Sequence, residues 1–367
     1  MAYTHMLFPG GNTCNGFHSF YQYIVPADAA RLFIFKGGPG VGKSTFMKKL
    51  SEDFSTCNLE LHWCSSDNDS LDAIVLSDYA IAVIDGTAPH IVDPRYPGAV
   101  DEIINLGEFW DESQLTGNRE KIIELTRMYQ SYFRVAYLRL KEAGAIWNEI
   151  TEYFRDSVPD SFLRTLKKTL KQEVLCNGVG PVGTEIWERH LFASAITPGG
   201  VVSHISTLLE EDYKVLALGG SPGTGLHDIM ASILEWSREE MIPVEVYHNC
   251  FMPSLLEMLI FRPAKTVMLD ASGMVTNHEQ LLARVKNGRF FDLDPEVDKG
   301  RRLQFNGEIE DSRERFNTAI SGAVGFLNLA KQLHDELEKF YVTAMDFERI
   351  ENKYGEIKNR ILQYIGQ

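Results

Sequence analysis

The segment 31–50, RLFIFKGGPGVGKSTFMKKL, constrains the fold of this chain more than any other. An apolar run at 32–35 precedes a glycine-rich stretch at 37–42, and apolar residues at helical spacing follow from 43 to 50. This order predicts a strand, a glycine loop and a helix. Glycine opens backbone conformations that other residues avoid, so successive N–H groups of such a loop can point at one bound anion.

The spacing also fits G-x-x-x-x-G-K-[ST], in which each residue type has a mechanical role. Lys43 would reach the β and γ phosphates of a nucleotide, and the Ser44 hydroxyl would ligate Mg²⁺. The predicted binding residues are Gly38, Pro39, Gly40, Val41, Gly42, Lys43, Ser44 and Thr45. The segment resembles the Walker A element of P-loop NTPases, and this resemblance implies ATP or GTP with Mg²⁺. The alternative is a glycine-rich turn without a ligand.

A second apolar strand is predicted at 79–86, with Asp85 near its end. A carboxylate at the end of a buried strand beside a phosphate loop can hold Mg²⁺ directly or through water. We therefore predict Ser44 and Asp85 as metal ligands, and Lys43 and Asp85 as catalytic residues. The alternative is that Asp85 ends the strand only because Asp favours turns.

The loop 86–98 that follows is rich in Pro, Gly and polar residues. Loops beyond the carboxyl ends of strands in open α/β sheets line the ligand crevice. The candidates for a substrate or switch role are Thr87, His90, Asp93 and Arg95. The alternative is a surface loop without a ligand.

Between the glycine loop and Asp85, the run 59–64 alternates like a strand. The polar cluster 65–70 offers N-caps for a short helix at 71–76. Strands that alternate with helices predict a parallel sheet covered on both faces.

A different pattern begins at residue 119, where apolar residues recur three and four positions apart up to residue 154. This spacing predicts a long helix or a helical pair, and a shorter helix follows at 161–175. The segment 177–183 is rich in Gly and predicts a linker.

The chain after the linker repeats the chain before it. A strand at 214–218 opens into a second glycine stretch, and the strand ending at Asp270 matches the strand ending at Asp85. Gly220, Pro222, Gly223 and Gly225 align with Gly37, Pro39, Gly40 and Gly42. A second helical stripe runs from 316 to 361. We therefore predict an α/β protein with two duplicated P-loop NTPase-like three-layer α/β/α cores, each with an inserted or appended helical hairpin, in units 1–183 and 184–367.

The second copy has Leu226 and His227 where the first has Lys43 and Ser44. It lacks both the ammonium group that binds phosphate and the hydroxyl that binds metal, so we predict one competent nucleotide site and one degenerate site. Across nearly the whole chain, this organisation resembles bacterial ATPase-like proteins with tandem P-loop domains, the second of which is degenerate.

Both halves also contain an H-x-C pattern near a strand end, His62 with Cys64 and His248 with Cys250. Residues i and i+2 of a strand share a face, so four N and S ligands would converge on Zn²⁺ if the halves met there. We favour ordinary strand-end residues that were duplicated together, because metal ligands normally cluster more closely in sequence.

The composition excludes several function classes. The 367 residues carry a net charge of −15 with a pI near 5.2, so non-specific nucleic acid binding is not expected. The chain shows no secretory pattern at its N-terminus and no run of apolar residues long enough for a membrane span. Five dispersed cysteines suit a reducing compartment. We expect a cytoplasmic protein that does not bind membranes.

The leading hypothesis is an ATP-dependent hydrolase or phosphotransferase. ATP is preferred to GTP because the chain lacks a guanine-reading N-K-x-D stretch. Phosphoryl transfer needs a group that orients the nucleophile and a cation on the γ-phosphate. The candidates for the first role are Asp67, Asp69 and His90, and those for the second are Arg95, Arg262 and Arg289.

Two alternatives stay open. A small-molecule or nucleotide kinase would use Arg119, Arg127 and Arg134 of the long helical segment as lid arginines. A nucleotide-responsive binding module would use ATP to set the angle between the halves and present its helices to a protein partner. The sequence leaves the phosphoryl acceptor and the protein partner undetermined.

Overall fold

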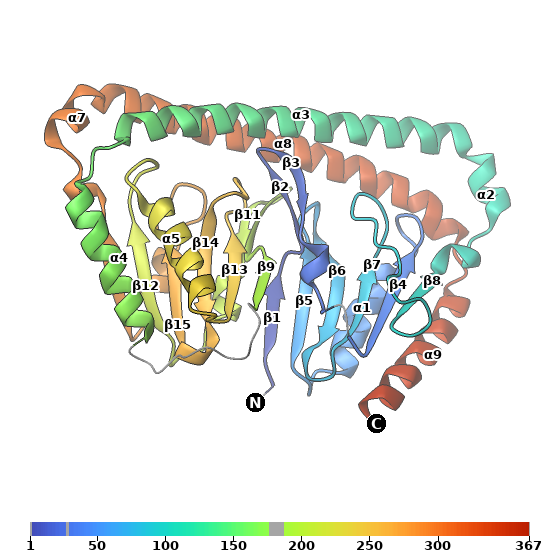
Figure 1. Ribbon diagram of the computed structural model, residues 1–367. Coiled ribbons are helices and arrows are strands. Elements are labelled where there is room, and N and C mark those ends of the chain that lie inside the picture. The colour runs from blue at the N-terminus through green and yellow to red at the C-terminus, as the bar shows by residue number, and fades with distance from the viewer. Residues whose placement is uncertain (1, 27–28, 176–186, 367) are drawn as a thin grey trace.

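The computed structural model describes residues 2–26, 29–175 and 187–366. Two six-stranded sheets stand side by side beneath a pair of long helices (Figure 1). The first sheet has the order β1 (Thr4–Leu7), β5 (Leu59–Cys64), β6 (Asp67–Leu76), β7 (Ile81–Asp85), β4 (Arg31–Lys36) and β8 (Asp101–Asn105). The second has the order β9 (Glu188–Leu191), β13 (Val244–His248), β14 (Leu256–Phe261), β15 (Thr266–Asp270), β12 (Lys214–Gly219) and β16 (Gly288–Asp292).

The two sheets repeat one pairing pattern. Read in the orders above, the first pair of strands is parallel, the next two pairs are antiparallel and the last two are parallel in both sheets. The predicted α/β class is confirmed, with mixed sheets. The shared strand order agrees with the repeat seen in the sequence.

Strand β6 corrects two predictions. We expected a short helix at 71–76, but this segment belongs to β6, which pairs antiparallel with both β5 and β7. The prediction of a parallel sheet is therefore wrong at β6. All six residues from 71 to 76 are buried between neighbouring strands, and such burial of apolar residues outweighs a local N-cap signal.

Helices α1 (Lys43–Asp53) and α5 (Leu226–Glu239) follow the two glycine stretches. The predicted helix at 119–154 is confirmed as one continuous helix, α3 (Arg119–Phe154), and α8 (Asn306–Ala344) lies against it. Figure 1 shows these two helices crossing above both sheets in opposite directions. The remaining elements are helices α2 (Glu112–Gly117), α4 (Asp160–Leu175), α6 (Glu279–Leu282), α7 (Lys299–Gln304) and α9 (Phe347–Ile365), and the hairpins β2 (Gly10–Thr13) with β3 (Gly16–Ser19) and β10 (Ser194–Thr197) with β11 (Gly200–Ser203).

The C-terminal helix α9 packs on the first sheet, although it follows the second sheet in the chain (Figure 1). Its buried face joins the cluster formed by β4 and α1, and the α9 residues in this cluster are Ile350, Tyr354, Ile357 and Ile361. Arg360 of α9 also donates to the Glu102 carboxylate of β8 at 2.9 Å. The first core is therefore completed by a helix from the other end of the chain.

Helix α4 makes the reciprocal exchange. It comes from the first half, and its Leu166, Leu170 and Val174 join the buried cluster of β12 and α5 in the second half. Glu173 of α4 pairs with Lys214 and Arg289 of the second sheet. The predicted linker at 177–183, with the boundary between units 1–183 and 184–367, lies outside the described residues.

The two halves meet at a reciprocal backbone bridge between Phe8 and Phe192. The Phe8 N–H donates to the Phe192 carbonyl at 2.9 Å, and the Phe192 N–H donates to the Phe8 carbonyl at 3.1 Å. Beside this pair, Arg189 of β9 donates to both carboxylate oxygens of Glu60 in β5 at 2.7 and 2.6 Å. The contact between the halves thus combines backbone bonds with a largely buried, bidentate ion pair.

Helices α1 and α9 cover one face of the first sheet, and the opposite face packs against the short 3₁₀ turn Tyr21–Tyr23 and Ile24. Within the described ranges, no helix is long and apolar enough to cross a membrane.

The exchange of α9 predicts a stability difference between two positions of that helix. Ile357 is fully buried against the first sheet, so Ile357→Ala is expected to lower the free energy of unfolding by about 2–5 kcal/mol. Leu362→Ala, at a side chain that is 47% exposed on the same helix, is the matched control and should cost far less. Urea denaturation measures both, and equal losses would contradict the packing of α9 described above.

Candidate functional site

The first glycine stretch forms a tight loop between β4 and α1. Gly37, Gly40 and Gly42 have φ angles of 153°, 68° and 88°, in the region that favours glycine. The predicted strand, glycine loop and helix are confirmed. The second stretch repeats the conformation, because the three aligned glycines have φ angles of 153°, 95° and 95°. The two loops therefore share a backbone shape despite different side chains.

Lys43, the first residue of α1, folds back over its own loop. Its Nζ donates to the carbonyl oxygens of Gly37 and Gly38 at 2.9 and 3.0 Å. The same atom lies 3.4 Å from Oδ2 of Asp85, and both side chains are largely buried. The ammonium group is thus held at the mouth of the loop, beside a carboxylate from the next strand of the sheet.

Two oxygen-bearing side chains, Ser44 and Asp85, were predicted to act together with this lysine. The Ser44 hydroxyl accepts from the Leu71 backbone N–H at 3.0 Å. Asp85 accepts from the Thr87 backbone N–H at 2.9 Å and from the Thr87 hydroxyl. A hydroxyl and a carboxylate are oxygen ligands of the kind that Mg²⁺ takes, so these two residues could hold that ion next to a phosphate bound in the loop.

Asp72 is a second carboxylate at this end of the sheet, and it was missed in the sequence. Ala73 of β6 pairs with Ile84 of β7 at the end of their ladder, and Asp72 and Asp85 are the next residues of the two strands, beside a bulge in the pairing of β6 with β5. Burial raises the pKa of Asp72, and the negative charge of Asp85 adds to this effect, whereas His90 opposes it. Asp72 was not predicted because we expected a helix at 71–76, and only a strand at this position brings Asp72 near the end of β7.

His90 lies beside this carboxylate pair. Its ring stacks on Tyr21 with centroids 4.5 Å apart, and only 8% of the residue is exposed. Both ring nitrogens lack a hydrogen-bond partner among the described residues. A buried, unpaired imidazole is uncommon and indicates a water or ligand that completes it. The predicted role of His90 in orienting a nucleophile stays a prediction.

Helix α8 of the second half forms the cover of the first loop. A side chain on Gly38 would collide with the Tyr341 ring, and one on Gly40 would lie 2.9 Å from the Glu338 carbonyl oxygen. Further along the helix, Nζ of Lys331 lies 3.3 Å from Oδ1 of Asp67. The first loop therefore lies directly against residues from the other half of the chain.

Asp67 begins β6, the strand that carries Asp72. Burial alone would raise its pKa, but hydrogen bonds from the Ser70 hydroxyl and the Asp69 backbone, with the nearby Lys331 ammonium, hold the pKa below the usual value. Lys331 was not among the predicted cations. It could not be recognised from the sequence, because it lies 264 positions from Asp67. Only the packing of α8 against the first half brings the two residues together.

The predicted arginines do not gather at the loop. Arg262 donates to both oxygens of Glu245 at 2.8 Å, and Arg289 pairs with Glu173, so both belong to ion pairs of the second half. The three lid candidates Arg119, Arg127 and Arg134 are exposed on α3. Asp69 is also exposed, and its backbone carbonyl accepts from Lys48.

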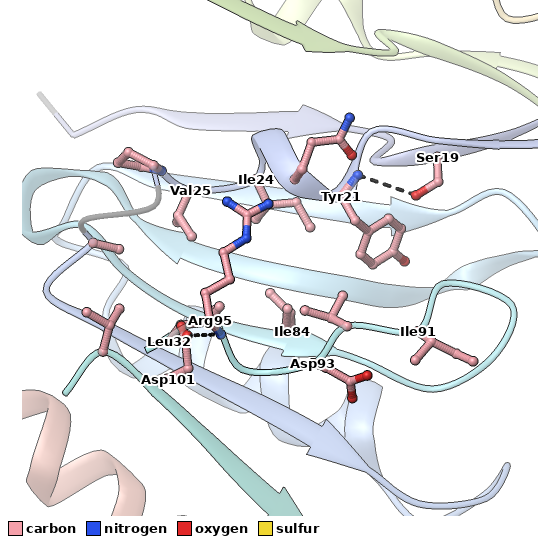
Figure 2. Close-up of a pocket in the computed structure, with 15 residues that line it drawn as sticks. Ser19, Tyr21, Ile24, Val25, Leu32, Ile84, Ile91, Asp93, Arg95 and Asp101 are labelled. Atoms are coloured by element: carbon pink, nitrogen blue, oxygen red, sulfur yellow. Dashed lines mark hydrogen bonds between the residues drawn. The ribbon is translucent and has the colours of Figure 1, made fainter. Parts of the chain in front are cut away.

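Asp93 and Arg95 line a cavity of about 270 Å³ (Figure 2). The cavity lies on the face of the first sheet that is opposite α1, between the loop 91–101 and the segment 19–26 with Ala29. Ile84 reaches its floor, whereas the neighbouring Asp85 points to the Lys43 side. These two loop candidates are thus separated by the sheet from the glycine loop.

The H-x-C residues do not form a common metal site within the described chain, where the single group of three possible ligands within 4.8 Å is His334, Asp335 and Glu338. His62 lies 3.4 Å from Glu60, and Nε2 of His248 lies 2.9 Å from Nδ1 of His190. The interpretation of ordinary strand-end residues is consistent with these contacts.

The second glycine loop is closed by the chain itself. The Asp294 carboxylate accepts from the Ser221 backbone N–H at 2.8 Å, and Arg313 donates to the Ser221 hydroxyl at 2.8 Å. Asp294 occupies the same turn after β16 that Gly107 occupies after β8. The second loop thus binds a carboxylate of its own half, and the first has glycine at the equivalent position.

Comparison with protein-family models, with curated proteins and with solved structures finds no match for this chain.

The contact between α8 and the first loop predicts the effect of one added methyl group. Gly40→Ala would place a Cβ 2.9 Å from the Glu338 carbonyl oxygen, whereas Gly98→Ala, at φ 78°, would meet no atom within 4 Å. Both variants place alanine at a positive φ, so this backbone strain cancels when the two losses of stability are compared. Gly40→Ala should lower the free energy of unfolding by about 1–3 kcal/mol more than Gly98→Ala does. Equal losses in urea denaturation would show that α8 does not press on the loop.

Proposed function

We propose that the protein binds ATP with Mg²⁺ at the first glycine loop and hydrolyses it or transfers its γ-phosphoryl group. The observation that carries this proposal is the difference between the two loops. The two loops share one backbone shape. The first has Lys43 and Asp85 at its mouth, whereas a backbone N–H of the second already donates to the Asp294 carboxylate. An anion site is thus supported in the first half and is already filled in the second.

In this proposal the P-loop residues share the work of binding phosphate. The backbone of the loop and the start of α1 would hold the phosphate oxygens, and these residues are Gly38, Pro39, Gly40, Val41, Gly42, Lys43, Ser44 and Thr45. On binding, the Lys43 ammonium would leave the carbonyl groups of its loop and pair with the β and γ phosphates. Ser44 and Asp85 would hold Mg²⁺, which neutralises the charge that develops on the phosphate.

Asp72 and His90 supply the groups that orient the nucleophile. The attacking oxygen, from water or from an acceptor hydroxyl, forms a bond to the γ-phosphorus while the bond to the β–γ bridging oxygen breaks. Asp72 accepts the proton of the nucleophile, a task that favours a carboxylate with a raised pKa. Lys331 of α8, which pairs with Asp67, takes the place of the predicted arginines as a second cation beside Lys43 in this proposal.

A nucleotide-responsive switch is the second candidate function. It is favoured by the contact of α8 with Gly38 and Gly40, because a phosphate that moves the loop also moves a helix of the other half. In that case ATP binds and turnover is slow. A protein partner would bind the outer surface of α3 and α8.

The test of nucleotide chemistry compares two lysines of α1. We expect Mg²⁺-dependent phosphate release from ATP by the wild-type protein and a loss of about 10²-fold or more in Lys43→Ala, because the charge on the transferred group is no longer neutralised. Lys49→Ala, an exposed neighbour paired with Glu351, is the control and should keep its activity.

Calorimetric titration with ATP separates the remaining outcomes. ATP binding that Lys43→Ala abolishes, without turnover, would favour the switch. An absence of both binding and turnover in the wild-type protein would overturn the proposal.

The role of Asp72 predicts a pH dependence. Because the pKa of Asp72 is raised, the carboxylate becomes available as a base only above the ordinary Asp range, so turnover should increase as pH rises through that value. Asp72→Asn should lower kcat by about 10²–10⁴-fold and leave ATP affinity nearly unchanged. Asp69→Asn, at an exposed site three residues away, is the control. A kcat that Asp72→Asn does not change would remove Asp72 from the mechanism.

A further inference from the structure

The second half keeps the carboxylate pair although its loop is closed. Met258 of β14 pairs with Leu269 of β15 at the end of their ladder, and Glu257 and Asp270 are the next residues of the two strands, beside a bulge in the pairing of β14 with β13. These two residues are the counterparts of Asp72 and Asp85, and they are 1% and 5% exposed. Asp270 lies beside His227 at the start of α5, Glu257 lies beside His278, and neither acid is paired with a lysine among the described residues.

An imidazole replaces the hydroxyl in this second constellation. His227 stands at the position of Ser44, and its Nδ1 lies 3.9 Å from Oδ2 of Asp270. Two ligands of one tetrahedral ion with bonds of about 2.1 Å are about 3.4 Å apart, so the pair is close to the spacing that a shared metal requires. Trp147 of α3 lies beside the His227 ring, with centroids 5.9 Å apart, and shields it.

Two buried polar atoms of this group have no hydrogen-bond partner in the part of the chain that is described. They are Nδ1 of His227 and Oε2 of Glu257. The other Glu257 oxygen accepts from the Ser194 hydroxyl at 2.9 Å and lies 3.5 Å from Nε2 of His278. Unpaired buried donors and acceptors call for an explanation, of which a bound ion is one.

We propose that His227, Asp270 and Glu257 bind a divalent transition metal of the Zn²⁺ class, independently of nucleotide at the first loop. Imidazole with carboxylates is a donor set for such ions, whereas the hydroxyl and carboxylate of the first half suit Mg²⁺. Ser194 and His278 contact only Oε1 of Glu257, so Oε2 is the atom that would bind the ion. The three ligand atoms do not all lie within 4.8 Å of one another in this structure, so metal binding requires these side chains to move closer together.

The group His334, Asp335 and Glu338 on α8 is the competing site. Its side chains come from one helix and are 32%, 44% and 34% exposed. Asp335 already accepts from Lys331 at 2.6 Å. This group offers the ion less burial than the second-half constellation does, and it provides a control within the same chain.

Co²⁺ titration of the full-length protein, followed by visible absorption and reversed by Zn²⁺, tests the proposal. We expect saturable binding that weakens by more than about tenfold in His227→Ala and in His227→Ser, which restores the residue of the first half. His334→Ala and Lys43→Ala should bind Co²⁺ as the wild type does. Zn²⁺ should also raise the unfolding temperature of the wild type but not that of His227→Ala.

Three results would overturn the site. They are an absence of saturable Co²⁺ and Zn²⁺ binding, binding that both His227 variants retain in full, and binding that His334→Ala abolishes. Circular dichroism of each variant shows that it is folded, so that a lost signal reports a lost ligand. Because Lys43→Ala is included, failure of the metal site and failure of ATP binding at the first loop are separate observations.

Discussion

The contact between α8 and the first glycine loop is the constraint on which the rest of the structure depends. The Glu338 carbonyl approaches Gly40 so closely that no side chain fits there, and the Thr151 carbonyl of α3 approaches Gly223 in the same way. Each long helix thus ends against the loop of the opposite half. Its continuation, α9 or α4, then completes the core of that half. The two halves form one interlocked molecule, because neither core is complete without a helix from the other.

Under the proposed function, this interlocking gives the glycines two roles. A loop that binds an anion needs positive φ angles and bare N–H groups, and a helix that packs on the loop needs the same absence of side chains. In the second half the packing survives and the anion is the chain's own Asp294. We infer that the demands of packing preserve the shape of a loop after its chemistry has changed, so that shape alone does not distinguish a working site from a structural one.

The proposed distinction between the two halves rests on the side chains at the ends of the strands. In the first half, Lys43 neutralises Asp85, and Asp72 stands beside it with a raised pKa because burial disfavours its charge. In the second half, the two acids remain and the lysine is lost, so their negative charge needs another partner. A divalent ion would supply it, and His227 offers the additional ligand. Under both proposals, each half has a pair of carboxylates. Lys43 is the cation beside them in the first half, and a divalent metal ion takes that place in the second.

Local sequence patterns determined much of this protein. The glycine spacing, the acid after a buried strand and the apolar stripe at 119–154 each depend on neighbours in the chain, and they correctly indicated the loop, Asp85 and α3. The repeat likewise indicated that the second half would share the arrangement of the first. Only the tertiary structure decided that 71–76 is a strand, that Asp72 lies near Asp85, and that Lys331 reaches Asp67. These features depend on strand pairing and helix exchange between residues far apart in sequence, for which no local pattern exists.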